Sequence, residues 1–269
     1  MRALKAQCEY RYQPEISYFY YFKSLKKAMI FYKLLFVHGI FLAHINTVHI
    51  LRKQQLALST KEFRARGYKV KRCEDCLIPE KKCICSQRPS IYSHSAFCLV
   101  MYKNEYYKPT NTGKLIADVI PDNYAFRWDR VTPDPALIEL LQNPKYVPIL
   151  VFPQQYAEAV RCINSPKDLV DIQQGKTPLF VMLDGTWREA SKMFKSPSFA
   201  TLPVLGIQPE KASSYQLREA AHVHQLCTAE VAIEVLKMAG DNHAAEALGE
   251  YFHQFKKAYI AGKAHLTLL

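Results

Sequence analysis

Short apolar runs alternate with helical patterns along most of the chain, and this alternation constrains the fold more than any other feature. Because short, strongly apolar strands that alternate with helices are typical of a parallel sheet covered on both faces, the sequence predicts an α/β fold. A polar loop is expected at 164–177. The predicted strands lie at 96–102 (AFCLVMY), 124–128, 148–152 (PILVF), 179–183 (LFVML) and 202–207, and the predicted helices at 47–66, 115–119, 135–142, 154–162, 186–194, 214–221, 228–239 and 243–260.

The positive charge of the chain is confined to its first quarter. Residues 1–72 contain 15 Lys and Arg against 3 Asp and Glu, whereas residues 73–269 contain 21 of each, so the net charge of +12 lies in the first segment. A basic arm on a neutral body favours an anionic partner, with nucleic acid ahead of a membrane surface. A solvated basic tail without a partner is the alternative.

The first 46 residues differ in composition from the rest, because they are rich in Tyr and Phe. The run at 28–45 is apolar but contains Lys33, His38 and His44. A membrane-spanning helix needs about 20 mostly apolar residues. A membrane span and an amphipathic interfacial helix are therefore less favoured than an atypical extension. We recognise no signal peptide and expect no stable membrane association.

The cysteines are unevenly distributed. Four of the eight lie within thirteen residues, as Cys73-x2-Cys76-x6-Cys83-x-Cys85. Thiolates at this spacing can close a tetrahedron around Zn²⁺, and with all four positions taken the metal is expected to be structural. The tight C-x-C pair leaves an iron–sulfur cluster as one alternative, and unligated thiols are another. The scattered remainder favours a reducing cytosol, with Cys98 and Cys162 expected to be buried.

A strand-to-helix turn carries the strongest sign of chemistry. The predicted strand LFVML is followed by Asp184, Gly185, Thr186 and Trp187. Ligands of parallel α/β sheets bind at the carboxyl ends of strands, and Thr186 with Glu189 fits a capping box that opens a helix. Gly185 permits close approach of a ligand, and the ring of Trp187 suits stacking on a base or an adenine. The alternative is an ordinary turn with a packed Trp.

Two further segments follow predicted strands in the same way. KPTNTGK (108–114) carries Asn111 and Thr112, whose polar groups suit a carboxylate or a phosphate. SSYQLRE (213–219) offers Arg218 as a clamp for a carboxylate, and CTAE soon afterwards opens another helix. Each segment alone fits ordinary helix capping equally well. Three such segments after successive strands would converge on one crevice.

Together these motifs resemble the DTW-domain family, which is named for a D-x-T-W motif. The CxxC…CxC cluster and the runs KPTNTGKLIADVIPD, DGTW, SSYQLREA and CTAEVAIEVL follow the order of that family over about residues 60–262. Residues 1 to about 50 have no counterpart in it, and Cys227 stands where the family often has Ser. The resemblance is closest to the bacterial tRNA-uridine aminocarboxypropyltransferases. It implies a SPOUT-like, trefoil-knotted parallel sheet flanked by helices.

The resemblance also implies an activity and a set of site residues. The activity is transfer of the 3-amino-3-carboxypropyl group of S-adenosyl-L-methionine to N3 of a uridine in the tRNA variable loop, expected at position 47, with methylthioadenosine as co-product. Asp184 is the candidate general base for the N3 proton. The expected catalytic residues are Asp184, Thr186 and Trp187, and the expected cofactor contacts are Asn111, Thr112, Gly185, Ser214, Arg218, Thr228 and Glu230.

We therefore expect three parts in the chain: an extension over 1–46, a basic helix and zinc knot over 47–90, and a catalytic domain over 91–269. The expected partners are tRNA and S-adenosyl-L-methionine, and the expected location is the cytoplasm. Two alternatives stay open, a SPOUT-type RNA methyltransferase that uses S-adenosyl-L-methionine and a non-catalytic zinc-containing RNA-binding protein. A carboxylate at a strand end argues against the second, because binding RNA does not need one.

Overall fold

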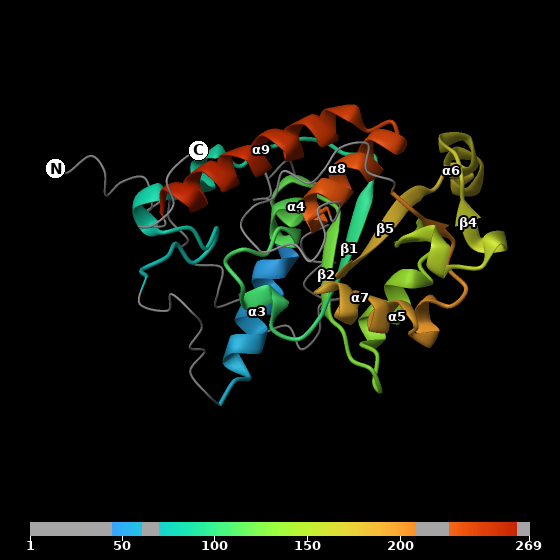
Figure 1. Cartoon of the computed structure of the whole chain (residues 1–269), viewed down its shortest axis with the longest axis horizontal. Helices are drawn as coiled ribbons and strands as arrows, with labels where there is room; N and C mark the ends of the chain where they lie inside the picture. Colours follow the sequence, from blue (N-terminus) through green and yellow to red (C-terminus); the bar gives the residue numbers. More distant parts are fainter. Residues whose placement is uncertain (1–44, 61–69, 208–225, 263–269) are drawn as a thin grey trace, which may run out of the picture. The chain divides into compact units, whose positions relative to one another are not determined.

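The computed structural model describes residues 45–60, 70–207 and 226–262 (Figure 1). Residues 46–269 belong to one compact unit and residues 1–45 to another. Most of the predicted extension and the predicted helix at 214–221 lie outside the described residues, as do Ser214 and Arg218.

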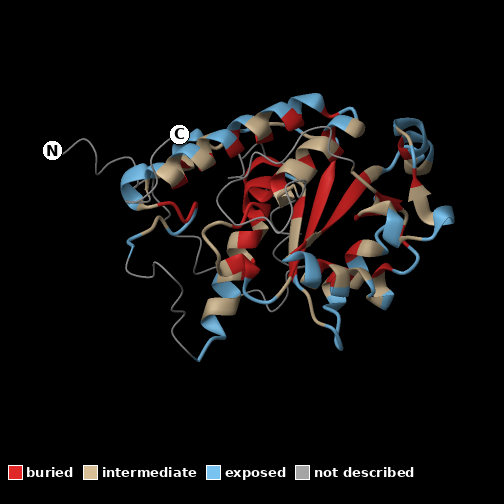
Figure 2. Cartoon of the chain, viewed as in Figure 1, coloured by how far each residue is buried: buried red, intermediate tan, exposed pale blue. Residues whose placement is uncertain are grey.

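The described strands form a six-stranded sheet in the order β2-β1-β5-β3-β6-β4, and every neighbouring pair is parallel. The three central strands are almost wholly buried, as Figure 2 shows. The prediction of a parallel α/β sheet is therefore confirmed. The trefoil knot and the relation to SPOUT proteins stay predictions. The strands are β1 (Ala96–Met101), β2 (Asn123–Arg127), β3 (Tyr146–Val151), β4 (Cys162–Ile163), β5 (Thr177–Asp184) and β6 (Val204–Leu205).

Helices cover both faces of the sheet because alternate strand residues point to opposite sides. In β1, Phe97 and Leu99 join a core shared with α3, α4, α8 and α9, whereas Cys98 and Val100 join a second core shared with α5 and α7 (Figure 1). The helices are α3 (Thr47–Ala57), α4 (Gly113–Val119), α5 (Pro135–Leu141), α6 (Pro166–Gln173), α7 (Trp187–Phe194), α8 (Thr228–Met238) and α9 (Asn242–Ala261).

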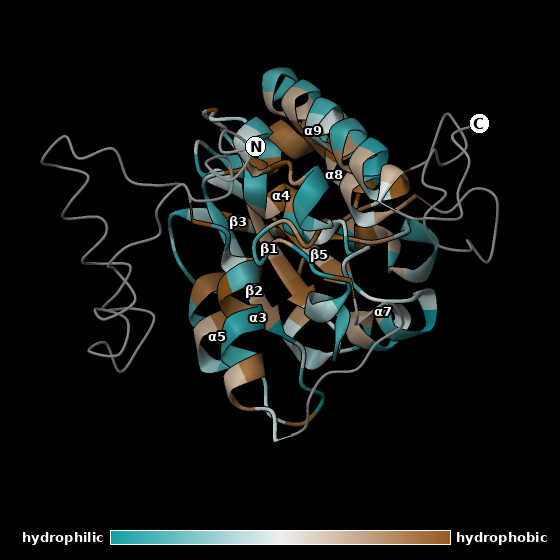
Figure 3. Cartoon of the chain, turned by 90° about the vertical axis from the view of Figure 1, so that its left-hand side faces the viewer, coloured by the Kyte–Doolittle hydropathy of each residue, from teal (hydrophilic) through white to brown (hydrophobic). Residues whose placement is uncertain are grey.

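The long helix α9 is amphipathic. Leu248, Phe252 and Phe255 lie at helical spacing and are buried, whereas His243 and Glu246 are exposed. Figure 3 shows hydrophobic and hydrophilic residues alternating along its length. Its apolar face packs against α8 and α4. Among the described helices, none is both long and apolar enough to cross a membrane.

Three predictions of local structure are wrong. The segment 154–162 is not one helix but two 3-10 turns, η4 (Gln154–Tyr156) and η5 (Ala159–Arg161), that lead into β4. The expected polar loop at 164–177 contains α6, which Ser165 caps by accepting a hydrogen bond from the backbone N–H of Asp168 at 3.1 Å. Of the helix predicted over 47–66, the described part ends at Ala57, where the backbone N–H of Leu58 closes the last turn, and residues 61–66 lie outside the described residues.

The segment of the four cysteines is joined to the sheet by a buried polar cluster. The carboxylate of Asp118, on α4, is fully buried and forms an ion pair with Arg88 at 2.8 Å. It also accepts hydrogen bonds from Asn46 at 2.8 Å and from the hydroxyl of Tyr251 on α9 at 3.3 Å. Burial lowers the pKa of Arg88, but Asp118, Tyr251 and Cys85 together outweigh burial and raise it above its usual value. The cluster therefore holds α4 against the residue before α3, the segment that carries Arg88, and α9.

Candidate active site

A pocket of about 270 Å³ opens at the carboxyl edge of the sheet. It is slightly smaller than the roughly 300–1,000 Å³ typical of small-molecule sites. Segments that follow β3, β5 and β6 line it, together with the first turns of α7 and α8, which is where ligands of parallel sheets bind. The lining residues are Val151, Phe152, Pro153, Met182, Leu183, Gly185, Trp187, Ala190, Ile207, Leu226, Thr228 and Val231.

Asp184 lies at the last position of β5, directly behind this pocket. Asp184 is only 3% exposed. The amide of Asn111 donates to Asp184 Oδ2 at 2.6 Å, and the hydroxyl of Thr228 donates to Asp184 Oδ1 at 2.9 Å. The backbone oxygen of Asp184 accepts from the N–H of Tyr102 at 2.8 Å, which extends the pairing of β1 and β5. Both carboxylate oxygens are therefore held in place by hydrogen bonds.

Helix capping brings Asn111 to the carboxylate. Asn111 Oδ1 accepts from the backbone N–H of Lys114 at 3.1 Å, which closes the first turn of α4 and leaves the amide nitrogen for Asp184. The hydroxyl of Thr112, expected to contact a cofactor, accepts from the backbone N–H of Ala229 at 3.3 Å. The loop before α4 is therefore tied to both β5 and the start of α8.

Gly113 packs directly on the same carboxylate. A Cβ at this position would lie 2.6 Å from Asp184 Oδ2 and 3.3 Å from Asn111 Oδ1. A contact under 3.0 Å forces something to move, and a buried carboxylate has little room to do so. The sequence KPTNTGK therefore needs its glycine for close packing at the carboxylate.

The first turn of α8 positions Thr228. A capping box joins Cys227 and Glu230, with the Cys227 backbone N–H donating to Glu230 Oε2 at 2.9 Å. The Cys227 thiol acts as the N-cap acceptor, and burial raises its pKa to about 12, so the thiol stays neutral. Glu230, expected among the cofactor contacts, is engaged in this cap.

A second capping box opens α7. The Glu189 carboxylate accepts from the backbone N–H and from the hydroxyl of Thr186, both at 2.7 Å. Thr186 is exposed and does not line the pocket, although it was expected to be catalytic. Gly185 does line the pocket, and a Cβ there would approach Tyr102 Cβ at 3.2 Å. The capping box thus fixes the turn so that Gly185 faces the pocket.

Two rings that line the pocket, those of Phe152 and Trp187, belong to an aromatic cluster. The ring of Trp187 stacks on Phe152 with a centroid distance of 5.3 Å and an interplanar angle of 4°, and Phe194 stacks on Phe152 at 4.4 Å. Tyr156 lies against both Phe152 and Trp187. Trp187 is 39% exposed and Tyr156 50% exposed. Half-exposed rings beside a pocket can stack on planar groups such as nucleobases.

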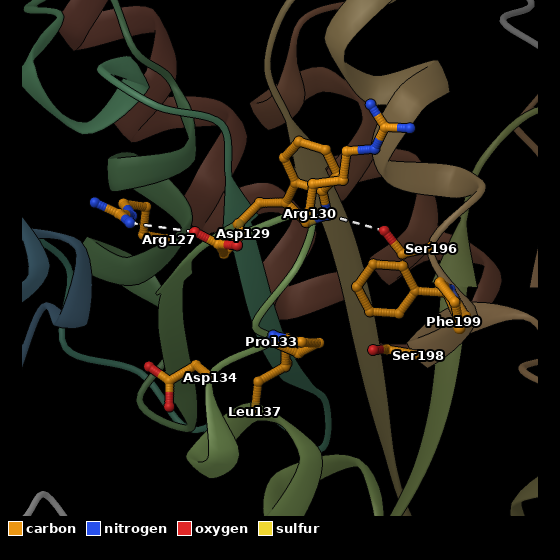
Figure 4. A pocket seen from close by; sticks show the side chains of 11 residues that line it. Arg127, Asp129, Arg130, Pro133, Asp134, Leu137, Ser196, Ser198 and Phe199 are labelled. Atoms are coloured by element: carbon orange, nitrogen blue, oxygen red, sulfur yellow. Dashed lines mark hydrogen bonds and ion pairs between the residues drawn. The ribbon is translucent and has the colours of Figure 1, made fainter.

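A much smaller hollow of about 20 Å³ lies beside the end of α7, between the loop after β2 and residues 196–199 (Figure 4). The indole N–H of Trp128 donates to the hydroxyl of Ser196 at 2.9 Å, and Trp128 also stacks on Tyr102. Arg127 and Asp129 at its rim form an ion pair, visible in Figure 4. Its volume suits about one water, so we assign it no ligand.

The four cysteines gather into one cluster. The Sγ atoms of Cys73, Cys76, Cys83 and Cys85 all lie within 4.8 Å of one another, so the cluster could hold a metal ion. Hydrogen bonds from the Cys76 and Cys85 thiols lower the pKa of Cys73 far below its usual value. The turn after Cys76 places Leu77 in the left-handed region, at φ 60°. All seven cysteines of the described ranges are free thiols; of the two expected to be buried, Cys98 is buried and Cys162 half-buried.

The buried cation of Lys114 interacts with this cluster through Cys76. Lys114 is only 1% exposed, and its ammonium donates to the backbone oxygen of Pro109 at 2.7 Å and lies 4.9 Å from the ring centroid of Phe255. Burial lowers the pKa of Lys114 to about 7, while negative charge on Cys76 and Asp118 acts in the opposite direction. A negatively charged metal–thiolate group would therefore stabilise the protonated lysine.

The structure brings together only some of the residues expected at the site. Asp184, Asn111 and Thr228 form one hydrogen-bonded group, with Gly185 and Trp187 beside it at the pocket. The sequence predicts no site role for four residues, which are Tyr102, Gly113, Phe152 and Tyr156. Gly113 lies in the KPTNTGK run, and Tyr102 and Phe152 end predicted strands, so their segments were identified but their contacts were not. Tyr156 lies in a segment with no recognisable motif.

Fold and site together define an α/β protein with a pocket at the carboxyl edge of a parallel sheet, a buried carboxylate behind it and a four-cysteine cluster. The DTW domain matches residues 70–260 of this chain. The chain therefore belongs to the DTW-domain family, which is linked to tRNA modification. No solved structure matches the chain.

Proposed function

We propose that this protein is a tRNA-uridine aminocarboxypropyltransferase. It transfers the 3-amino-3-carboxypropyl group of S-adenosyl-L-methionine to N3 of a variable-loop uridine and releases methylthioadenosine. The observation that carries the proposal is the position of Asp184 in a DTW-family chain. Asp184 is the last residue of the central strand β5, and its carboxylate lies immediately behind a pocket at the carboxyl edge of the sheet.

The pocket suits the nucleoside part of S-adenosyl-L-methionine. Its wall is largely apolar and aromatic, and Trp187 stacked on Phe152 offers a planar surface for an adenine or for the uracil. Gly185 lets a ligand approach the backbone of the turn. Ser214 and Arg218, proposed contacts of the methionine arm, lie outside the described residues.

The reaction requires removal of the uridine N3 proton. The nitrogen then attacks the methylene carbon next to sulfur, the carbon–sulfur bond breaks, and its electron pair stays on sulfur as neutral methylthioadenosine. Asp184 is the proposed acceptor of the proton, because hydrogen bonds from Asn111 and Thr228 fix the position of its carboxylate behind the pocket. Methyl transfer differs only in which carbon faces the nucleophile, so the outcome depends on positioning.

The four-cysteine cluster fits a structural Zn²⁺. Bonds of about 2.3 Å in a tetrahedron place thiolates about 3.8 Å apart, and the Cys73–Cys85 and Cys76–Cys83 sulfur distances are 3.6 and 3.8 Å. Zinc would add no chemistry to the reaction, since all four ligand positions are taken. It would hold the segment that carries Arg88 against α4.

The RNA partner is proposed from charge and location together. Near the pocket, α7 carries Arg188 and Lys192 on its exposed surface, and Lys195 follows it. Such cations beside stacking rings suit the backbone of a splayed single-stranded loop. Free thiols in the described ranges agree with a cytoplasmic enzyme.

The test is incubation of purified protein with unmodified tRNA and S-adenosyl-L-methionine labelled in the methionine arm, followed by mass spectrometry of the nucleosides. We expect one aminocarboxypropyl group on a variable-loop uridine, and its loss in Asp184→Asn. A gain of methyl would identify a methyltransferase instead. Unchanged tRNA that is nevertheless bound would identify a binding protein.

A further inference from the structure

Asp184 is the proposed base, yet it is not a lining residue of the pocket. The described residues that line the pocket include its neighbour Gly185 and its hydrogen-bond partner Thr228, but not Asp184. Asp184 is 3% exposed, whereas Thr228 is half-buried. The group placed between the pocket and the carboxylate is therefore the hydroxyl of Thr228, which donates to Asp184 Oδ1 at 2.9 Å.

The direction of that hydrogen bond decides what the hydroxyl can do. A threonine hydroxyl has one O–H donor and two acceptor lone pairs. The donor is used on Asp184, so the lone pairs point elsewhere. Within the described ranges, no backbone or side-chain group donates to Thr228 Oγ1. A donor inside the pocket is the partner that would satisfy it.

We propose that Thr228 is a catalytic residue that relays the substrate proton from the pocket to Asp184. This inference rests on the proposed function. The uridine N3–H donates to Thr228 Oγ1, and the proton passes to that oxygen as the threonine's own proton passes to Asp184 Oδ1. Nitrogen keeps the electron pair of the broken N–H bond and forms the bond to carbon, and the thioether leaves. Thr228 ends as the neutral alcohol and Asp184 as the carboxylic acid.

The surroundings hold this hydroxyl in place. Thr228 is the first residue of α8, between the capping box of Cys227 and the bond from Ala229 N–H to Thr112. The other carboxylate oxygen is held by Asn111. The hydroxyl of Thr186 is excluded from this role, because it donates to Glu189 away from the pocket.

The test compares kcat for aminocarboxypropyl transfer in wild type, Thr228→Val, Thr228→Ser and Asp184→Asn. Valine keeps the branched shape and removes the hydroxyl, so we expect kcat to fall by about 100-fold or more, with little change in the Kd for S-adenosyl-L-methionine. Serine restores the hydroxyl and should recover most of kcat. Thr177→Val is the matched control and should behave as wild type, because Thr177 begins β5, at the opposite end of that strand from Asp184.

Two further measurements separate a relay from a structural role. The double variant Thr228→Val/Asp184→Asn should lose no more activity than the worse single variant, because both act in one proton path. In mixtures of H₂O and D₂O, a plot of the wild-type kcat against the fraction of D₂O should follow the curve expected when two protons move in the same step. Wild-type kcat in Thr228→Val, additive losses in the double variant, or a one-proton dependence would each overturn the relay while leaving the proposed transfer intact. A wild type that transfers nothing to tRNA would overturn both.

Discussion

At the scale of single residues, the carboxylate of Asp184 is positioned by contact as much as by hydrogen bonds. Gly113 lies where a Cβ would approach Asp184 Oδ2 at 2.6 Å. Asn111 reaches the same oxygen from the turn that Gly113 begins. The site therefore tolerates no side chain at this position, although nothing in the backbone angle of Gly113 requires glycine.

Gly113→Ala is expected to lower kcat by about 10-fold or more while the protein stays folded. The added methyl displaces the carboxylate, and small misplacements of reacting groups can cost as much as about 100-fold in rate. Overpacking should also lower the free energy of unfolding by about 1–3 kcal/mol. Steady-state kinetics and urea denaturation measure the two effects.

Gly249→Ala is the control for this substitution. Gly249 lies inside α9, where a Cβ would meet only Ile233 Cδ1, at 3.9 Å. Alanine should stabilise the helix by roughly 0.5–1 kcal/mol and leave kcat unchanged. Equal activity in Gly113→Ala and Gly249→Ala would show that Asp184 is not held by this contact.

Sequence alone predicts which residues end strands but not which partners they meet. Asp184 could be placed at a strand end because LFVML precedes it and T-x-x-E follows it. Its bond to Asn111 joins residues 73 positions apart. That bond depends on β1 and β5 being neighbours, which the apolar pattern does not specify. The same limit explains why Glu230 was expected at the cofactor and instead caps α8.

At the scale of elements, α4 connects the cysteine cluster to the proposed active site. Its first turn is closed by Asn111, which contacts Asp184, and near its end Asp118 binds Arg88, three residues after Cys85. Cys76 and Ile84 belong to the same core as the buried residues of α4. One short helix thus separates the carboxylate of the site from the segment that a metal would organise.

Removal of the metal is expected to destabilise the segment of the four cysteines while the sheet stays folded. We predict that the wild type binds about one zinc ion per chain. We expect Cys83→Ser to lose this zinc and to exchange backbone amide hydrogens faster over residues 70–92 and at the end of α9. Pro79 packs near Gly262 there, so the two should loosen together. Exchange measured by mass spectrometry, alongside metal analysis, gives both readouts.

Cys162→Ser is the matched control for metal removal, because Cys162 is half-buried and belongs to no cluster of ligands among the described residues. It should keep the metal and the wild-type exchange pattern. Unchanged exchange in a metal-free Cys83→Ser protein would show that the hydrophobic contacts of Cys76, Ile78 and Ile84 suffice without a metal.

Elements were predictable where several signals agree. Strands β1, β3 and β5 are dense apolar runs, and α7 and α8 carry capping boxes, so their places could be predicted within about two residues. The segment 154–162 has helical composition but starts after Pro153 and adopts two short 3-10 turns. There the pairing of β4 with β6 overrides local propensity. Ser165 and Pro166 are residues that commonly begin a helix, as they do in α6. They lie in a polar run, however, and for that reason the sequence predicts a loop there.

At the scale of the whole molecule, part of the positive charge lies outside the unit that carries the proposed site. Residues 1–44 hold 7 Lys and Arg against 2 Asp and Glu, residues 45–72 hold 8 against 1, and residues 73–269 are neutral. The proposed site lies wholly in the compact unit that begins at Asn46. Asn46 itself is buried and binds Asp118 and the backbone oxygen of Lys114, so the unit needs its first residue.

A chain that begins at Ile45 is therefore expected to fold and to keep its chemistry but to bind tRNA more weakly. The melting temperature and kcat at saturating tRNA should match those of the full chain, because the shortened chain keeps every hydrogen bond of Asp184 and Asn46 named above. The Kd for tRNA should rise. The slope of log Kd against log salt should become shallower by roughly 0.7–0.9 for each phosphate that the arm neutralises in the full chain.

The salt slope separates an RNA-binding arm from the other two interpretations of the first residues. If they are a solvated tail, the two chains will have the same Kd and the same slope. If they bind an acidic membrane surface, the full chain alone will bind vesicles of anionic lipid, and its affinity for tRNA will equal that of the shortened chain. A loss of folding in the shortened chain would instead place these residues in the compact unit, contrary to the boundary at Asn46. Because kcat is compared at saturating tRNA, a weaker Kd cannot be mistaken for damage to the carboxylate and its partners.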